Sequence, residues 1–218
     1  LDDSIEFAAA LLGAWQAGKT IWLSADNMVA SCIALEHAVD GFLGEFPAQC
    51  SPLQATVIAE EGPLPFIALS NDLPALVVHT SGTTGAAQAI PKNLGQLSSE
   101  VMTLEATFGD MLGDACIVAT VSHQHIYGLL FKVLWPLWAG RAIHARSQNF
   151  PEQLAQLLSH GSCVLIASPA HLKRLPDHLA WSDVTALRAI FSSGGPLSPE
   201  GAQTTAQLLG QVPIEVYG

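Results

Sequence analysis

Apolar side chains recur every three or four residues over much of this chain, and that spacing gives a helix one buried face. The clearest case follows Asn93, which can cap a helix and form a capping box with Gln96. Ser198 is a second well-marked start, because Pro199 follows it at the first helical position. The spacing predicts helices over 4–17, 28–39, 94–108, 126–139, 152–159, 170–175 and 199–210.

The first predicted helix has one evident apolar face. Ser4 is its expected cap, and Gly18 is expected to end it, since glycine adopts the left-handed backbone common at helix ends. The residues predicted to face inward are Ile5, Ala8, Ala9, Leu12 and Trp15.

Short apolar runs alternate with these helices and are expected to be strands. They lie at 21–23, 55–59, 76–78, 116–121, 141–145, 163–167, 187–191 and 214–217. The alternation predicts an α/β fold with a largely parallel sheet flanked by helices. Binding sites in such sheets gather beyond the carboxyl ends of the strands, which points to the segments after Val78 and Phe191 and to Tyr217.

Composition adds limits on the class of protein. The chain has 218 residues, of which 50% are hydrophobic and 12% charged, which suits one globular domain or two small subdomains. The formal net charge is −11, and Lys19 is the only Lys or Arg before residue 73. An acidic chain with few clustered bases is a poor partner for nucleic acid or for an anionic membrane surface.

The four cysteines, Cys32, Cys50, Cys116 and Cys163, are widely spaced and form no C-x-x-C pair. Free buried thiols in a reducing compartment are expected, rather than a disulfide framework or a zinc site. The most apolar segment, 126–140, is shorter than the roughly 20 residues that span a bilayer. No signal-peptide pattern is visible, so a cytoplasmic protein is predicted.

Six glycine and hydroxyl residues stand in a row just behind the apolar run 76–78, separated from it by His79 alone. The glycines let successive backbone N–H groups turn inward as a nest for an anion, and the hydroxyls add donors. A tight turn after a strand is the alternative, but the density of these residues favours a phosphate site. The candidate phosphate-binding residues are Thr80, Ser81, Gly82, Thr83, Thr84, Gly85 and Lys92.

Thr80–Gly85 resembles the phosphate loop of the adenylate-forming enzymes, which include acyl- and aryl-CoA synthetases, peptide-synthetase adenylation domains and luciferases. In that family a lysine follows the loop, and Gln88 stands at its position here. Lys92 is the candidate substitute. The resemblance implies that the loop grips the triphosphate of ATP and the leaving pyrophosphate.

The stretch His125–Gly128 resembles the family's motif at the acyl-substrate pocket. The resemblance implies that His125 flanks the carboxylate and the reacting phosphate as the candidate catalytic residue, with Tyr127 and Gly128 beside the acid. The alternative is a polar helix start whose histidine is hydrogen-bonded in the core. His123 and His125 would point the same way in a strand, but no third ligand lies nearby and no metal site is predicted.

Two further segments resemble the family's adenine pocket. A glycine pair in 191–197 lets a flat base lie against the backbone, and 216–218 resembles the start of the Tyr-Gly-x-Thr-Glu motif. An ordinary strand-to-helix turn and a core tyrosine are the alternatives. The residues expected to hold adenine are Ser193, Gly194, Gly195 and Tyr217.

The four matches, in family order, imply the N-terminal part of an ATP-dependent acid–thiol ligase. Residues 1–72 are expected to be an incomplete helix and strand region, and 73–218 the phosphate-loop and substrate-pocket subdomain. The mobile C-terminal domain and the protein ligand of Mg²⁺ are expected outside this chain, which alone should be inactive. A fatty or aryl acid is favoured by the apolar segment 126–138, and the thiol would belong to CoA or to a carrier protein's phosphopantetheine.

Two other functions stay open. A non-catalytic nucleotide-binding or regulatory module would retain the fold, and Gln88 in place of lysine favours it. A P-loop NTPase would use Lys19, because 13–20 literally match G-x-x-x-x-G-K-[ST]. That motif needs a strand before it and a helix after it, and here the predicted order is reversed.

Overall fold

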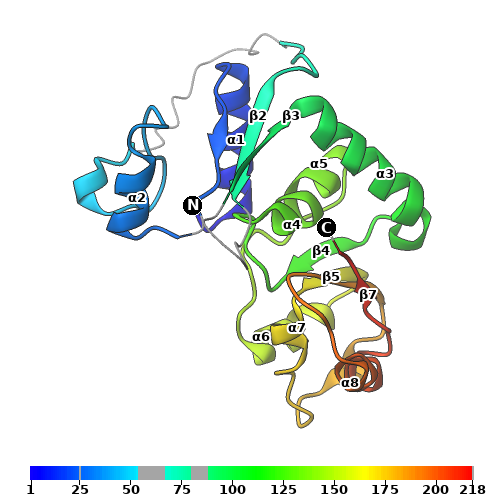
Figure 1. The fold of residues 1–218 in the computed structure, drawn as a ribbon. Helices are drawn as coiled ribbons and strands as arrows, with labels where there is room; N and C mark the ends of the chain where they lie inside the picture. Colours follow the sequence, from blue (N-terminus) through cyan, green and yellow to red (C-terminus); the bar gives the residue numbers. More distant parts are fainter. Residues whose placement is uncertain (25, 54–66, 80–87, 218) are drawn as a thin grey trace, which may run out of the picture. The chain divides into compact units, whose positions relative to one another are not determined.

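The computed structural model describes residues 1–24, 26–53, 67–79 and 88–217 (Figure 1). They form two compact units, one from Leu1 with the described part of 3–98 and one from Asp2 with 99–217. The division at residues 1–72 and 73–218 expected from the sequence stays a prediction. Among the described helices, none combines the length and the apolar character that a membrane crossing requires.

The first unit begins with α1 (Ser4–Gln16), and its cap differs from the prediction. Asp3, not Ser4, is the cap, because its carboxylate accepts hydrogen bonds from two backbone N–H groups of the first turn. The buried face is Ser4, Ala8, Leu11 and Trp15. The expected inward positions Ile5, Ala9 and Leu12 are therefore wrong, and all three are exposed.

One hydrogen bond explains how α1 is oriented on its sheet. The indole Nε1 of Trp15 donates to the Ala75 carbonyl over 2.8 Å, in a buried position. A buried indole N–H without a partner would be costly, so this bond selects the helix face that carries Trp15. The helix ends before Gly18, which has the expected left-handed backbone at φ +70°.

The sheet of the first unit has the order β1 (Ile21–Trp22), β2 (Pro74–His79), β3 (Ala89–Asn93). β1 runs parallel to β2, and β2 pairs antiparallel with β3. Strand β3 was not predicted, because Pro91 interrupts its apolar pattern; proline is tolerated there since β3 is an edge strand.

Three smaller predictions for this unit have mixed outcomes. The helix α2 (Val29–Leu35) is shorter than the predicted 28–39. The loop at 47–52 contains the 3-10 turn η1 (Ala48–Cys50). The predicted strand at 55–59 lies outside the described residues.

The long helix α3 (Leu94–Leu112) starts as predicted. The Gln96 amide donates to Asn93 Oδ1 over 2.8 Å, and the Asn93 amide donates to Gln96 Oε1 over 2.9 Å, which is the reciprocal pairing of a capping box. Leu97 and Val101 on the predicted face are buried.

The second unit is built on a four-stranded, fully parallel sheet. Its order is β4 (Cys116–Ala119), β5 (Cys163–Ala167), β6 (Leu187–Ser192), β7 (Ile214–Glu215). The α/β fold class with a largely parallel sheet is thus confirmed. The strand predicted at 141–145 is wrong, since only Ile143 forms an isolated bridge, to Ile117.

Helices cover both faces of this sheet. On one face lies a continuous helical segment of α4 (Ile126–Gly128), the π-helix η2 (Leu129–Leu134) and α5 (Trp135–Ala139), ended by Gly140 at φ +71°. Its Phe131 and Trp135 rings contact Phe191 of β6.

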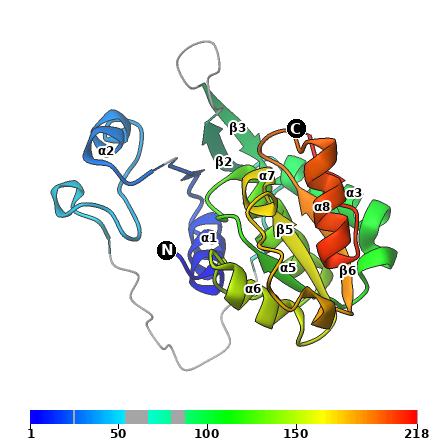
Figure 2. The same cartoon turned by 90° about the horizontal axis from the view of Figure 1, so that it is seen from below.

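The opposite face is covered by α6 (Pro151–Leu158), α7 (Pro169–Leu172) and α8 (Pro199–Leu209). Figure 2 shows α7 and α8 over strands β5 and β6. Their apolar side chains share one core with β4, β5 and β6, in which Leu158, Leu165 and Ile190 are completely buried. Ser198 caps α8 as predicted, its Oγ accepting from the Gly201 amide.

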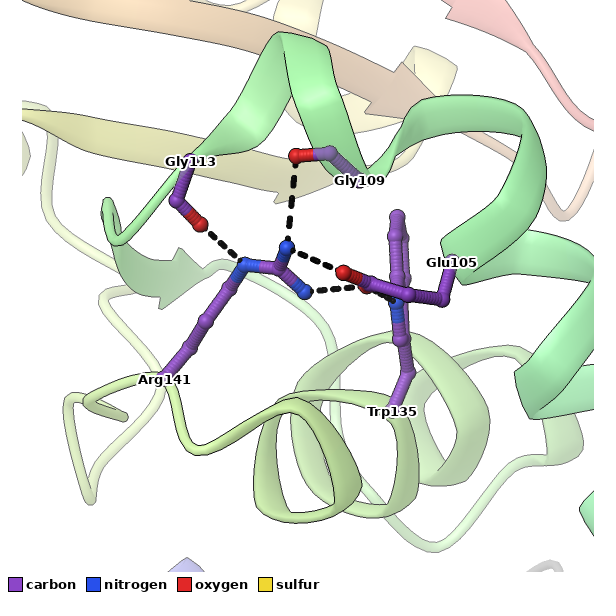
Figure 3. Close-up of polar contacts among 5 residues, drawn as sticks. All are labelled: Glu105, Gly109, Gly113, Trp135 and Arg141. Atoms are coloured by element: carbon purple, nitrogen blue, oxygen red, sulfur yellow. Dashed lines mark hydrogen bonds and ion pairs between the residues drawn. The ribbon is translucent and has the colours of Figure 1, made fainter.

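An ion pair joins Glu105 of α3 to Arg141, the second residue after α5 (Figure 3). The Arg141 guanidinium binds both carboxylate oxygens of Glu105 and donates to the carbonyls of Gly109 and Gly113. Trp135 Nε1 donates to the same carboxylate over 2.6 Å, and the guanidinium carbon lies 5.6 Å from the centre of the Trp135 ring. The Arg141 bond, ahead of the Trp135 bond, holds the pKa of Glu105 below its usual value.

Candidate active site

The predicted phosphate loop, Thr80–Gly85, lies outside the described residues. Its flanks are described: β2 ends at His79, β3 starts at Ala89, and these two residues are register partners. Lys92 lies three residues further along β3, opposite Leu76, and is half-buried. Three residues of strand span roughly 10 Å, so Lys92 stands well away from the paired end at His79 and Ala89.

The segment His125–Gly128, the candidate acid motif, begins at the end of a turn that follows β4. His125 is the residue before α4, its side chain is exposed, and its carbonyl accepts the Leu129 amide over 2.7 Å. His123 is instead 2% exposed. Because 121–125 are not a strand, the two histidines do not form the side-by-side pair considered from the sequence.

Tyr127 lies against the sheet with its hydroxyl buried. Its ring centre is 5.0 Å from that of Phe131, and the backbone of Ala167 at the end of β5 is adjacent to the hydroxyl. Among the described residues, that oxygen has no hydrogen-bond partner. Burial raises the pKa of Tyr127, so this group stays a neutral donor and acceptor at physiological pH.

Gly128 is required by sterics. A Cβ at this position would lie 2.0 Å from the Ser122 carbonyl oxygen and 2.7 Å from its carbon. The turn and the first helical residues are thus in direct backbone contact. Gly128 is therefore needed for the backbone to adopt this turn, independently of any contact with a bound acid.

Two hydroxyl residues at strand ends were missed by the sequence analysis. Thr120 Oγ1 and Ser192 Oγ are buried and, like the Tyr127 hydroxyl, have no partner among the described residues. Ser192 is the register partner of Ala167, and the Thr120 amide donates to Ile166 O. The unpaired hydroxyls lie at the carboxyl ends of β4 and β6, and no sequence signal beyond a hydroxyl residue after an apolar run distinguishes them.

The glycine pair after β6 forms an open turn. Gly194 has φ +89° and Gly195 has φ +156°, and a Cβ on either would meet no atom within 4 Å. Both are exposed, which leaves backbone accessible to a flat ring. Ser193 is held at the strand end, since its amide donates to the Ala167 carbonyl over 3.3 Å. The turn also leads into α8, so it serves as a strand-to-helix connection as well.

Tyr217 is fully exposed in the described chain and does not pack in the core of the described residues. It follows β7, whose neighbour Val216 donates to the Ser192 carbonyl over 2.8 Å. Tyr217 and the glycine turn therefore lie at the same edge of the four-stranded sheet as the acid motif. Lys92 belongs to the first unit and is not placed with them.

The phosphate-loop match at 13–20 has the wrong surroundings. Helix α1 precedes Lys19 and strand β1 follows it, the reverse of a P-loop. The Lys19 ammonium lies 2.7 Å from Asp40 Oδ2, in an exposed ion pair. Within the described ranges, no group of three or more His, Cys, Asp or Glu side chains could hold a metal ion, and all four cysteines are free thiols.

A family model and two curated proteins match this chain and agree with one another on the class of enzyme. The family model described as AMP-binding enzyme matches residues 25–218. A probable CoA ligase of Humulus lupulus, CCL5, is 30% identical over 131 residues, covering 58% of this chain and 24% of that protein. An acetyl-coenzyme A synthetase of Pyrobaculum arsenaticum is 25% identical over 151 residues, covering 65% of this chain and 22% of that protein.

Solved structures with the same fold cover all or nearly all of this chain. A malonyl-CoA ligase in a ternary product complex with methylmalonyl-CoA and AMP has a TM-score of 0.81 at 24% identity, covering 98% of this chain and 49% of that one. A Brucella canis acyl-CoA synthetase has a TM-score of 0.74 at 22% identity, covering 100% and 46%. This chain thus spans about half of those solved chains and about a quarter of the curated relatives.

Proposed function

This chain belongs to the family of AMP-binding enzymes, and we propose that its protein activates a carboxylic acid with ATP and transfers the acyl group to a thiol. A carboxylate oxygen attacks the α-phosphorus of ATP, pyrophosphate leaves and an acyl-adenylate forms. The thiol sulfur then attacks the acyl carbon, AMP leaves and a thioester results. The family match over residues 25–218, which includes all four segments that resemble the adenylate-forming enzymes, is the observation that carries this proposal.

On the nucleotide side, Thr80–Gly85 would hold the triphosphate and the leaving pyrophosphate, with Lys92 as the candidate cation. Ser193 and the two glycines that follow it, together with Tyr217, would hold adenine. The open, left-handed turn at Gly194 supports this role, because a flat base needs backbone that no Cβ shields. Bound Mg²⁺ would neutralise phosphate charge.

On the acid side, His125 would flank the carboxylate, and Tyr127 and Gly128 would border the acyl group. The Tyr127 and Phe131 rings and the apolar helix behind them favour a fatty or aryl acid. The relatives named as CoA ligases and as an acetyl-CoA synthetase support CoA as the thiol. A carrier protein's phosphopantetheine arm is the other candidate. The mobile C-terminal domain typical of the family would complete the site.

The test is carboxylate-dependent exchange between ATP and labelled pyrophosphate, measured on the complete protein with a panel of fatty and aryl acids. We expect exchange with at least one acid, and none from residues 1–218 alone. Thr84→Ala should reduce the rate by about 10²-fold, the usual loss when one preorganised donor to developing charge is removed. Lys19→Ala is the matched control and should leave the rate unchanged, since Lys19 lies in an exposed ion pair with Asp40.

Two results would contradict the proposal. Nucleotide binding without exchange for any acid would indicate the non-catalytic module that Gln88 favours. Loss of nucleotide binding in Lys19→Ala, with Thr84→Ala unaffected, would indicate a P-loop site instead.

A further inference from the structure

A lysine is buried in the helix that follows the acid motif. Lys132 is 0% exposed and lies in the π-helical stretch Leu129–Leu134. Burying an ammonium group is costly unless polar groups replace its lost water. Short π-helical stretches are frequent at functional sites. A charged side chain at this position therefore points to a role that an apolar residue could not fill.

The Lys132 side chain starts a directed chain of hydrogen bonds. Its Nζ donates to Ser147 Oγ over 3.0 Å. The Ser147 hydroxyl in turn donates to the carbonyl oxygen of Val121 over 2.8 Å. Because the ammonium can only donate, it occupies a lone pair of the hydroxyl and directs the hydroxyl proton toward Val121. Successive bonds of this kind polarise and strengthen one another.

Val121 is where the backbone leaves β4 for the turn that carries the acid motif. Further along the turn, the Ser122 carbonyl packs against Gly128, and Ser122 Oγ accepts from the Gln124 amide over 3.2 Å. The turn is thus held from the strand side at Val121 and from the helix side at Ser122. The side chain of His125, at the end of this turn, is exposed to solvent.

We propose that Lys132 is a positioning residue: through Ser147 it fixes the Val121 carbonyl, and with it the turn that places His125 and Tyr127 beside the acid. This inference rests on the proposed function, which assigns those two residues to the acid site. Neither Lys132 nor Ser147 contacts the acid in this proposal. They act on the geometry of the residues that do.

The first test is kinetic and uses the complete protein. Ser147→Ala removes the hydroxyl between the ammonium and the carbonyl, and Lys132→Met removes the ammonium at similar side-chain length. Each should lower kcat/KM for the acid about tenfold, because small misplacements of reacting groups reduce rates steeply. KM for ATP should stay unchanged. The double variant should be no worse than the more damaged single one, since both changes break the same chain of bonds.

The second test does not depend on activity. Hydrogen–deuterium exchange of the peptide covering 121–130 should accelerate in both single variants. Thr205→Val is the matched control: this residue is also completely buried, and its hydroxyl bonds the Gly201 carbonyl within α8 over 2.8 Å. It should lower thermal stability without changing exchange at 121–130 or kcat/KM for the acid.

The outcomes of these tests distinguish failure of the positioning role of Lys132 from failure of the proposed function. Unchanged exchange at 121–130 in both variants would overturn the positioning role, and so would faster exchange with unchanged kcat/KM for the acid. If the unmodified protein shows no acid-dependent activity at all, the proposed function fails, and the exchange measurement still decides whether Lys132 and Ser147 hold the turn. If Lys132→Met does not fold, Ser147→Ala alone decides the question, because it keeps the lysine.

Discussion

The ion pair between Glu105 and Arg141 gives a quantitative prediction for stability. The Arg141 side chain is 5% exposed and the Glu105 side chain 28% exposed. Glu105→Gln keeps the shape of the side chain but leaves the guanidinium without a counter-charge. Removing one partner of a fully buried pair costs about 3–5 kcal/mol. We expect Glu105→Gln to lower the free energy of unfolding by about 2 kcal/mol, because Glu105 is partly hydrated and the Gly109 and Gly113 carbonyls still accept from Arg141.

The stability difference between the unmodified protein and Glu105→Gln should depend on pH, because the pKa of Glu105 is lowered in the folded state. A carboxyl whose pKa is lower in the folded state stabilises the fold above its unfolded-state pKa and loses that contribution as the pH falls through its folded-state pKa. The usual value is 4.5 and the folded value lies below it. The stability difference between the unmodified protein and Glu105→Gln should therefore be constant from pH 7 to about pH 5 and shrink at lower pH.

The assay is urea unfolding followed by far-ultraviolet circular dichroism at a series of pH values. Glu100→Gln is the matched control, because Glu100 lies exposed on the same helix and should change stability by less than about 0.5 kcal/mol. A difference below 0.5 kcal/mol for Glu105→Gln at pH 7 would refute the reasoning. So would a full difference that persists at pH 3, since the carboxyl would then not be the group responsible.

Two further predictions concern single positions. Gly128→Ala should lower the free energy of unfolding by about 3 kcal/mol or more, because the added Cβ would clash with the rigid Ser122 carbonyl. Gly13→Ala in α1 is the control, because a Cβ there would meet no atom within 4 Å. It should be neutral or slightly stabilising in the same urea assay. Burial raises the pKa of Cys163 to about 11, so its thiol should stay protonated at pH 8. Cys163 should therefore react with an aromatic disulfide reagent far more slowly than Cys50, which is only partly buried. Equal reaction rates of the two thiols, measured by mass spectrometry, would contradict this prediction.

Local signals were the ones that sequence analysis could use. The capping box at Asn93, the cap at Ser198 and the left-handed glycine at Gly18 depend on residues within one or two turns, and the structure has each of them. Strand β5 is an uninterrupted apolar run, and its predicted bounds match the observed ones.

The errors arose where distant residues decide the outcome. The inward face of α1 depends on the bond from Trp15 to Ala75, 60 residues away in the sequence, which no periodicity reveals. The run at 141–145 is apolar enough for a strand, but Arg141 is turned to Glu105, and only one bridge to β4 forms. The Lys132–Ser147 bond was likewise invisible, because a lysine in an apolar helix gives no indication of its partner.

The structure also separates what the acid motif contributes to shape from what it contributes to chemistry. Gly128 is demanded by contact with Ser122, so any protein with this turn would need a glycine there, active or not. His125 has no such structural duty for its side chain, which lies exposed while only its carbonyl joins the helix. The fold alone therefore accounts for Gly128, whereas the catalytic role of His125 is a proposal that rests on its exposed side chain. Substitution of His125, with Gly128 intact, is the change that tests the chemistry without disturbing the turn.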